Sequence, residues 1–170
     1  MALNNLGYVA YREGDYATAL SFFKQSAEID RKLGAMGLYA LKLGNVGECA
    51  RILGDETTAR QCLLESLRLS HALGSSFNVA NALWGLCELA PPESGVQLLA
   101  ASYALFEQLK VKLNAAEQDE LNEKRRRLRE ALGDAFEAGW AAGWAMSLEA
   151  AIALASRQSS PTYLSSSPTY

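Results

Sequence analysis

The chain has 170 residues, of which 49% are hydrophobic, and this is enough apolar material for one compact domain or a short helical array. The net charge of −3 argues against a dedicated nucleic-acid binder, which is usually basic overall. No apolar run approaches the ~20 residues that span a bilayer, and no basic residue followed by an apolar run opens the chain as in a secretory signal. We therefore expect a cytoplasmic protein without a direct nucleic-acid or membrane partner.

The first half of the sequence contains an internal repeat. When the sequence is compared with itself at a shift of 40 residues, identical residues coincide throughout one unit. The coinciding residues are Asn5 and Asn45, Gly7 and Gly47, Ala10 and Ala50, Gly14-Asp15 and Gly54-Asp55, Ala19 and Ala59, Ser26 and Ser66, and Leu33-Gly34 and Leu73-Gly74. Because glycine, alanine and aspartate stay in register over the whole unit, the pattern indicates a repeated structural element.

The first part of a unit predicts a helix with one apolar stripe. Leu3, Leu6 and Ala10 recur at helical spacing. Gly7 lies within this stripe, and we expect a second helix to approach closely there because glycine has no side chain.

The second part of a unit predicts another helix that packs on the first. Gly14 ends the first helix, and Asp15 is expected to cap the next by accepting backbone hydrogen bonds. Ala19 allows close pairing and Phe23 fills the space beside it, before Gly34 ends the second helix. Neither helix buries its stripe alone, so the unit must stack on a neighbour.

A third, shortened unit follows the two similar ones. Gly85 takes the place of Gly47 at a slightly shorter interval, and Pro92 suits the first turn of the next helix because proline lacks a backbone N–H. Gly95 and Leu99 then take the roles of the alanine and leucine on the inner face of the preceding unit. The three units span about residues 1–34, 35–74 and 75–110.

These residues resemble the tetratricopeptide repeat. Leu6-Gly7, the turn Gly14-Asp15-Tyr16, and Ala19 followed four residues later by Phe23 match its signature. The chain departs from that signature where Leu3 replaces tryptophan, Ala10 replaces tyrosine and Arg31 stands at a frequent proline position. The repeat unit is also longer than the usual length of about 34 residues, which marks a divergent subclass.

After Lys110 the period is lost, and residues 111–157 predict a three-helix C-terminal cap. Asn114 and Glu117 form a capping box that opens a helix ended by Gly133. A short helix with Trp140 and Trp144 on one face follows, and Ser147 caps the last helix. The fold class is therefore predicted as all-α: a right-handed α-solenoid of three tetratricopeptide-like helix pairs (1–110) closed by this cap.

The C-terminal stretch resembles the end of large bacterial transcriptional regulators. The segment from Leu132 to Phe136, then Trp140, Gly143, Met146-Ser147 and Glu149-Ala150, is similar to the MalT-like tetratricopeptide arrays of NB-ARC or STAND-type ATPase regulators. The resemblance covers roughly residues 2–156 and implies a sensor or interaction arm. A phosphate-binding loop is absent from this chain, and the sequence opens inside a repeat, so we expect a fragment or a truncated relative.

The sequence offers no catalytic constellation. His71 is the only histidine, near a predicted helix end, and no catalytic triad is built without it. Cys49, Cys62 and Cys87 are too few and too dispersed for a zinc site or a disulfide framework, and are interpreted as small buried hydrophobes. We expect no enzymatic activity, no cofactor and no metal.

Two further segments have open interpretations. The basic run Lys124–Arg129 either binds phosphate or RNA or, as we favour, is a solvated helix face whose charges pair at a spacing of four: Glu120 with Lys124, Glu123 with Arg127 and Arg126 with Glu130. The tail 158–170 repeats Ser-Ser-Pro-Thr-Tyr at Ser159–Tyr163 and Ser166–Tyr170. It is expected to be extended, and either docks through Tyr163 or Tyr170 or is incidental.

The first helices of the pairs are expected to line a concave groove. Residues off the packing stripe give the candidate partner-binding set Asn4, Tyr8, Tyr11, Arg12, Asn45, Glu48 and Arg51, together with Ile52. Tyr8 and Arg51 are the expected anchors, because tyrosine and arginine dominate binding hot spots. In the third unit Ala82, Leu83, Leu86 and Leu89 predict that the groove becomes apolar toward the cap.

The predicted function is a protein- or peptide-binding scaffold, as the sensor or interaction arm of a signalling or transcriptional regulator. Two alternatives remain open. One is a structural oligomerisation module that pairs through exposed repeat edges, and the other is a sensor that binds a small-molecule inducer.

Overall fold

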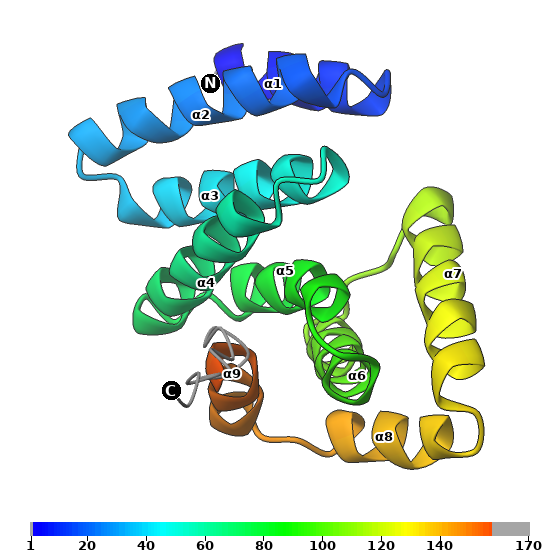
Figure 1. Cartoon of the computed structure of the whole chain (residues 1–170). Helices are drawn as coiled ribbons and strands as arrows, with labels where there is room; N and C mark the ends of the chain where they lie inside the picture. Colours follow the sequence, from blue (N-terminus) through cyan, green and yellow to red (C-terminus); the bar gives the residue numbers. More distant parts are fainter. Residues whose placement is uncertain (1, 158–170) are drawn as a thin grey trace, which may run out of the picture.

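In the computed structural model, described for residues 2–157, the chain is entirely helical in nine α-helices and one short 3-10 turn (Figure 1). The helices are α1 (Ala2–Arg12), α2 (Tyr16–Lys32), α3 (Met36–Ile52), α4 (Glu56–Ala72), α5 (Ser76–Leu86), α6 (Pro92–Gln108), α7 (Ala115–Leu132), α8 (Ala135–Trp144) and α9 (Leu148–Arg157), with the 3-10 turn η1 (Cys87–Leu89) after α5. No strand occurs within this part of the chain. The predicted all-α class and the expected number of helices are confirmed, whereas the predictions for Tyr163 and Tyr170 lie outside the described residues.

Helices α1 to α4 end in one recurring turn. Gly14, Gly34, Gly54 and Gly74 follow one another at a regular interval and all have positive φ, between 69° and 83°. At each turn the glycine N–H donates to the carbonyl three residues before it, and the next N–H donates to the carbonyl five residues before it. These bonds satisfy carbonyls that the helix end leaves free, in a geometry that glycine adopts without steric cost. Lys110 closes α6 in the same way with φ 56°.

Side-chain caps begin the helices where the sequence predicts them. Asp15 and Asp55 each accept the backbone N–H three residues ahead at 3.0 Å. Asn114 and Glu117 form the expected capping box at the start of α7. Ser147 accepts the Ala150 N–H at 3.2 Å before α9.

The expected close approach of paired helices is confirmed at two equivalent glycines. A Cβ placed on Gly7 would lie 2.6 Å from the ring of Phe23, and one on Gly47 would lie 2.6 Å from Cγ of Leu63. Both partners are 1% exposed. The repeat in the sequence therefore corresponds to a repeated packing contact between α1 and α2 and between α3 and α4.

The helices pack mainly against their neighbours in sequence. Each helix from α1 to α6 contacts the next, while α8 and α9 pack against α6. Figure 1 shows α7 to the right of α5 and α6, with α8 below α6 and α9 below α5. The largest buried cluster gathers residues of α4, α5, α6, α7 and α9, with Leu67, Leu83 and Leu98 each fully buried.

Three predictions about side-chain placement are wrong. Leu6 belongs to no buried stripe: it is 48% exposed, because no helix among residues 2–157 covers the outer side of α1. Ala82, Leu83 and Leu86 are at most 2% exposed, so they lie in the core instead of lining a groove. The basic run on α7 is only in part a solvated face, because Lys124 is 1% exposed, although the three predicted ion pairs Glu120–Lys124, Glu123–Arg127 and Arg126–Glu130 are all formed.

No helix among residues 2–157 is long and apolar enough to cross a lipid bilayer.

Trp140 packs against the main core as expected, whereas Trp144 at the end of α8 is 44% exposed.

Candidate binding groove

A groove of about 330 Å³ lies between the first helices of the three pairs and the start of α7. Its lining comes mostly from α1, α3 and α5, with contributions from α2, α4, α6 and the loop that leads into α7. The lining residues are Tyr8, Tyr11, Phe23, Leu41, Gly44, Asn45, Glu48, Leu63, Ser66, Phe77, Asn78, Asn81, Trp84, Gly85, Phe106, Leu113, Glu117 and Glu120.

Aromatic rings form much of the groove wall, and buried rings hold them in place. Tyr8 packs edge-on against Phe23 with 5.2 Å between ring centroids. Phe77 and Trp84, one at each end of α5, both pack on Phe106, at 6.1 and 6.0 Å. Phe23 and Phe106 are buried, so the exposed rings have fixed supports. A rigid aromatic wall loses little side-chain entropy when a partner binds.

Asparagine side chains add polar groups to the same surface. The Asn45 amide donates to the Tyr8 hydroxyl at 3.1 Å, which joins α3 to α1. Asn81 donates to the Phe77 carbonyl at 2.9 Å, and Asn78 lies one turn before it on α5. An amide both donates and accepts, which matches the alternating groups of an extended backbone. The hydrogen bond between Asn45 and Tyr8 joins the second repeat unit to the first. Asn5, which is equivalent to Asn45 in the first unit, is exposed on α1.

The remaining polar lining is acidic. Glu48 accepts two hydrogen bonds from Arg51, at 2.6 and 3.0 Å. Glu120 accepts the indole N–H of Trp84 at 2.7 Å. Tyr11 lies near both carboxylates, and its pKa is raised by burial first and by Glu48 and Glu120 next. Among the described residues that line the groove there is no lysine or arginine.

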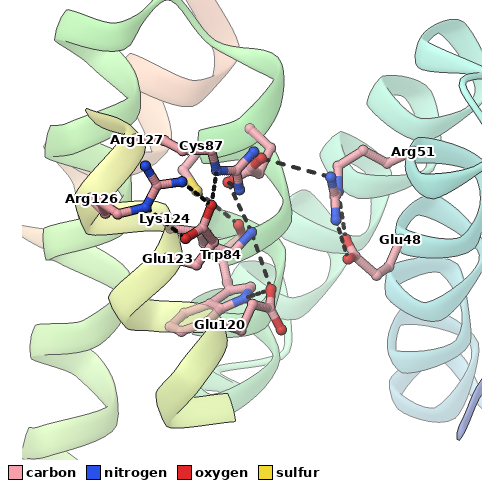
Figure 2. A network of polar contacts seen from close by, with 10 residues as sticks. Glu48, Arg51, Trp84, Cys87, Glu120, Glu123, Lys124, Arg126 and Arg127 are labelled. Carbon is pink, nitrogen blue, oxygen red and sulfur yellow. Dashed lines mark hydrogen bonds and ion pairs between the residues drawn. The ribbon is translucent and has the colours of Figure 1, made fainter. Parts of the chain in front are cut away.

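An ion network behind the groove fixes α7 in position (Figure 2). The ammonium group of Lys124 lies 3.1 Å from a carboxylate oxygen of Glu88 and 3.1 Å from one of Glu120. Glu88 also pairs with Arg127 at 3.1 Å and with Arg51 at 3.8 Å. Figure 2 shows Arg51 of α3 and Lys124 and Arg127 of α7 directed toward the same cluster of polar groups. Because all three pair with Glu88 of η1, the network joins α3 and α7 through η1.

The electrostatics of Glu88 follow from this crowding of cations. Burial on its own would raise the Glu88 pKa, but Lys124, Arg127 and Arg51 together hold the pKa below the ordinary value. Glu88 is therefore ionised at neutral pH, and Lys124 keeps its charge although it is 1% exposed. The contacts of Lys124 and Glu88 in this network position α7, because they join it to η1 and, through Arg51, to α3.

Four of the seven residues predicted from the sequence line this groove, namely Tyr8, Tyr11, Asn45 and Glu48. The other three do not: Asn4 is half-buried outside the lining, Arg12 is exposed elsewhere, and Arg51 lies behind Glu48. Arg51, an expected anchor, is instead part of the ion network.

The prediction missed the contribution of α5 and α7. Leu41, Asn45 and Glu48 on α3 have a spacing of i, i+4 and i+7, and the groove residues of α5, which are Phe77, Asn81 and Trp84, have the same spacing. This shared spacing is the feature of the sequence that identifies the groove residues of α5. The prediction aligned Gly85 with Gly47 instead, and that alignment assigned the buried face of α5 to the groove. Nothing in the sequence pairs Glu117 and Glu120 with α3, because α7 lies outside the repeat.

The single histidine and the three cysteines of the chain do not line the groove. No cluster of three or more potential metal ligands occurs among residues 2–157. His71 lies exposed in the last turn of α4. Burial raises the pKa of the Cys49 and Cys87 thiols to about 12, so both are protonated and unreactive at neutral pH.

Comparison of the chain with protein-family models, with curated proteins and with solved structures found no match in any of the three.

Proposed function

We propose that this chain is a tetratricopeptide-like helical scaffold that binds a protein or peptide in the groove between α1, α3, α5 and α7. The observation that carries the proposal is the groove itself. It combines exposed aromatic rings on buried supports with amide and carboxylate groups, and it runs across three consecutive helix pairs. Grooves of this composition fit extended chains, because rings provide apolar contact area while amides bind the backbone.

The repeated contacts support a right-handed solenoid as the framework of this groove. Gly7 with Phe23 and Gly47 with Leu63 are close contacts at equivalent positions of the two repeat units. The recurring glycine turns join successive helices at regular intervals. In this proposal residues 1–110 form the array, and 111–157 form a cap whose helix α7 also provides one wall of the groove.

The biological setting of the proposal comes from sequence resemblance. The likeness to the C-terminal arrays of STAND-type regulators motivates a role as a sensor or interaction arm of a signalling or transcriptional regulator. The coding sequence next to this chain tests that setting, since an adjoining ATPase would favour it and an unrelated neighbour would argue against it.

Selection from a displayed library of random peptides tests the proposed binding. We expect selected peptides to bind the chain, and Phe77→Ala to weaken binding at least about tenfold, the effect of removing a hot-spot ring. Trp144→Ala is the matched control, because its ring is 44% exposed against 45% for Phe77 but lies outside the groove. Failure to select any peptide, or equal losses in the two variants, would contradict the proposal.

A second candidate function is self-association through the outer face of α1. Leu6 and Val9 are 48% and 53% exposed, whereas their repeat equivalents Val46 and Cys49 are 3% and 0% exposed because the preceding helix pair covers them. The same face of a second copy of the chain would cover Leu6 and Val9 in a two-fold symmetric dimer.

Light scattering over a range of protein concentrations distinguishes this candidate. A dimer that Leu6→Gln converts to monomer, while Leu53→Gln leaves it intact, would support self-association. Leu53 is a suitable control because it is 47% exposed at the end of α3. A chain that is monomeric at every concentration tested would exclude it.

A further inference from the structure

We infer that the partner segment is basic: an extended peptide that places a lysine or arginine side chain between Glu48 and Glu120, with an apolar side chain about three residues away. The inference rests on the proposed function and specifies the chemistry of the partner. It follows from the charge of the groove, from the position of its cations and from the spacing of its two ends.

The charge at one end of the groove is negative and incompletely balanced. Three carboxylates, those of Glu48, Glu88 and Glu120, share three cations, those of Arg51, Lys124 and Arg127. Arg127 is also shared with Glu123. Glu117 also lines the groove, and within the described part of the chain its carboxylate accepts the Asn114 backbone N–H at 2.7 Å but forms no ion pair, so its negative charge is not balanced by a cation.

The excess negative charge faces the groove and not the interior. Glu48, Glu117 and Glu120 line the groove, whereas Arg51 and Lys124, which pair with Glu48 and Glu120, do not. Glu120 uses a single oxygen, Oε1, for both Trp84 and Lys124, and within the described part of the chain its Oε2 makes no hydrogen bond or ion pair (Figure 2). An ionised carboxylate accepts about four hydrogen bonds, so Glu120 has capacity for a cationic donor.

The two carboxylates are close enough to act on one side chain. Glu48 pairs with Arg51 and Glu120 pairs with Lys124, and both cations also pair with Glu88, so the two carboxylates lie at the same end of the groove. The Trp84 ring lies beside Glu120, to which its indole donates at 2.7 Å. Aromatic rings next to carboxylates favour a guanidinium or ammonium group, which gains ion-pair and cation–π attraction together.

The other end of the groove is apolar. Leu41 lies seven residues before Glu48 on α3, and Phe77 lies seven residues before Trp84 on α5. Seven residues of α-helix rise about 10 Å, which is the length of about three residues of extended chain. A basic residue at the acidic end would therefore be accompanied by an apolar residue three positions along the peptide, in contact with Phe77.

Fluorescence anisotropy with short acetylated and amidated peptides tests the inference. The probes carry arginine and leucine three positions apart in an otherwise uncharged sequence, and the comparison peptides replace arginine with glutamine or glutamate. We expect the arginine peptide to bind at least about tenfold more tightly than the glutamine peptide at low salt. The difference should narrow as salt screens the partly exposed carboxylates.

Matched variants show which carboxylates cause the preference for the arginine peptide. Glu48→Gln and Glu120→Gln should each reduce the preference for arginine, with thermal melts to confirm that the variant is folded. Glu130→Gln removes the same charge from the exposed face of α7 outside the groove and should keep the preference. If Glu120→Gln unfolds the chain, Glu48→Gln alone decides the result.

The possible failures are distinguishable. Equal binding of the arginine and glutamine peptides, with both weakened by Phe77→Ala, would overturn the basic partner and leave the proposed function intact. An equal loss in Glu130→Gln would also overturn it, because the attraction would then come from the overall charge. No binding by any peptide, including those selected from a random library, would overturn the inference and the proposed function together.

Discussion

Removal of the Glu88 carboxylate should destabilise the chain strongly, because it leaves a buried ammonium group with half of its partners. Glu88→Ala deprives Lys124, which is 1% exposed, of one of the two carboxylates 3.1 Å from its ammonium nitrogen. Breaking a buried pair costs about 3–5 kcal/mol. Since Glu120 remains, we expect a cost near the lower end, about 3 kcal/mol of unfolding free energy.

A second substitution should recover part of this loss. Adding Lys124→Met removes the buried charge and keeps most of the side-chain volume, so the double variant should be more stable than Glu88→Ala by about 1–2 kcal/mol. Glu123→Ala is the control on the same helix, because its side chain is 50% exposed and its arginine pairs should contribute less than about 1 kcal/mol.

Urea denaturation followed by circular dichroism gives these free energies, and amide hydrogen exchange gives the local effect. Because the network joins α7 to α3 and η1, Glu88→Ala should accelerate exchange in α7 more than in α2 or α4. A cost below about 1 kcal/mol for Glu88→Ala, or a double variant that loses the sum of both single costs, would refute the reasoning.

Glu88 also gives a prediction about how the stability of the chain depends on pH. The folded state lowers the Glu88 pKa below its ordinary value of 4.5, so the contribution of Glu88 to stability is complete above that value. It is lost as the pH falls through the lowered pKa of the folded state. The difference in stability between the parent chain and Glu88→Ala should therefore shrink in acid, and a difference that grows below pH 4.5 would contradict the assigned direction of the shift.

Three further predictions concern the framework. Gly47→Ala places a Cβ 2.6 Å from Leu63 and should cost about 1–3 kcal/mol in a urea titration; a neutral result would mean that the helix pair adjusts freely. Lys110→Gly removes a side chain from a residue with φ 56° and should raise stability by about 1 kcal/mol, seen as a higher melting temperature. Truncation of the chain from Asn114 onward uncovers α6, including fully buried Leu98, and should cause aggregation or loss of cooperative melting, because several apolar side chains at about 1.5–3 kcal/mol each exceed the margin of most domains. A soluble truncation with an unchanged melting temperature would contradict the structural role of the cap.

The sequence alone determined the local structure of this chain. Helices, their ends and their caps depend on groups a few residues apart, so periodicity, the glycine turns and residues such as Asp15 and Asn114 predicted them correctly. The contact of Gly7 with Phe23 was also predictable, because a missing side chain and a large one recur together in both units. On α1 and α3 four groove residues followed from the same periodicity.

The groove as a whole was decided by tertiary structure. The helical period defines faces but not which neighbour covers each face, so Leu83 was assigned to the groove and Phe77 and Trp84 were missed. The position of α7, which follows the repeat, brings Glu120 to the groove wall and buries Lys124. The charge of Lys124 and its spacing from Glu120 predicted a solvated side chain. Its burial is favourable only because α7 packs beside η1 and α5, where the carboxylates of Glu88 and Glu120 contact its ammonium group.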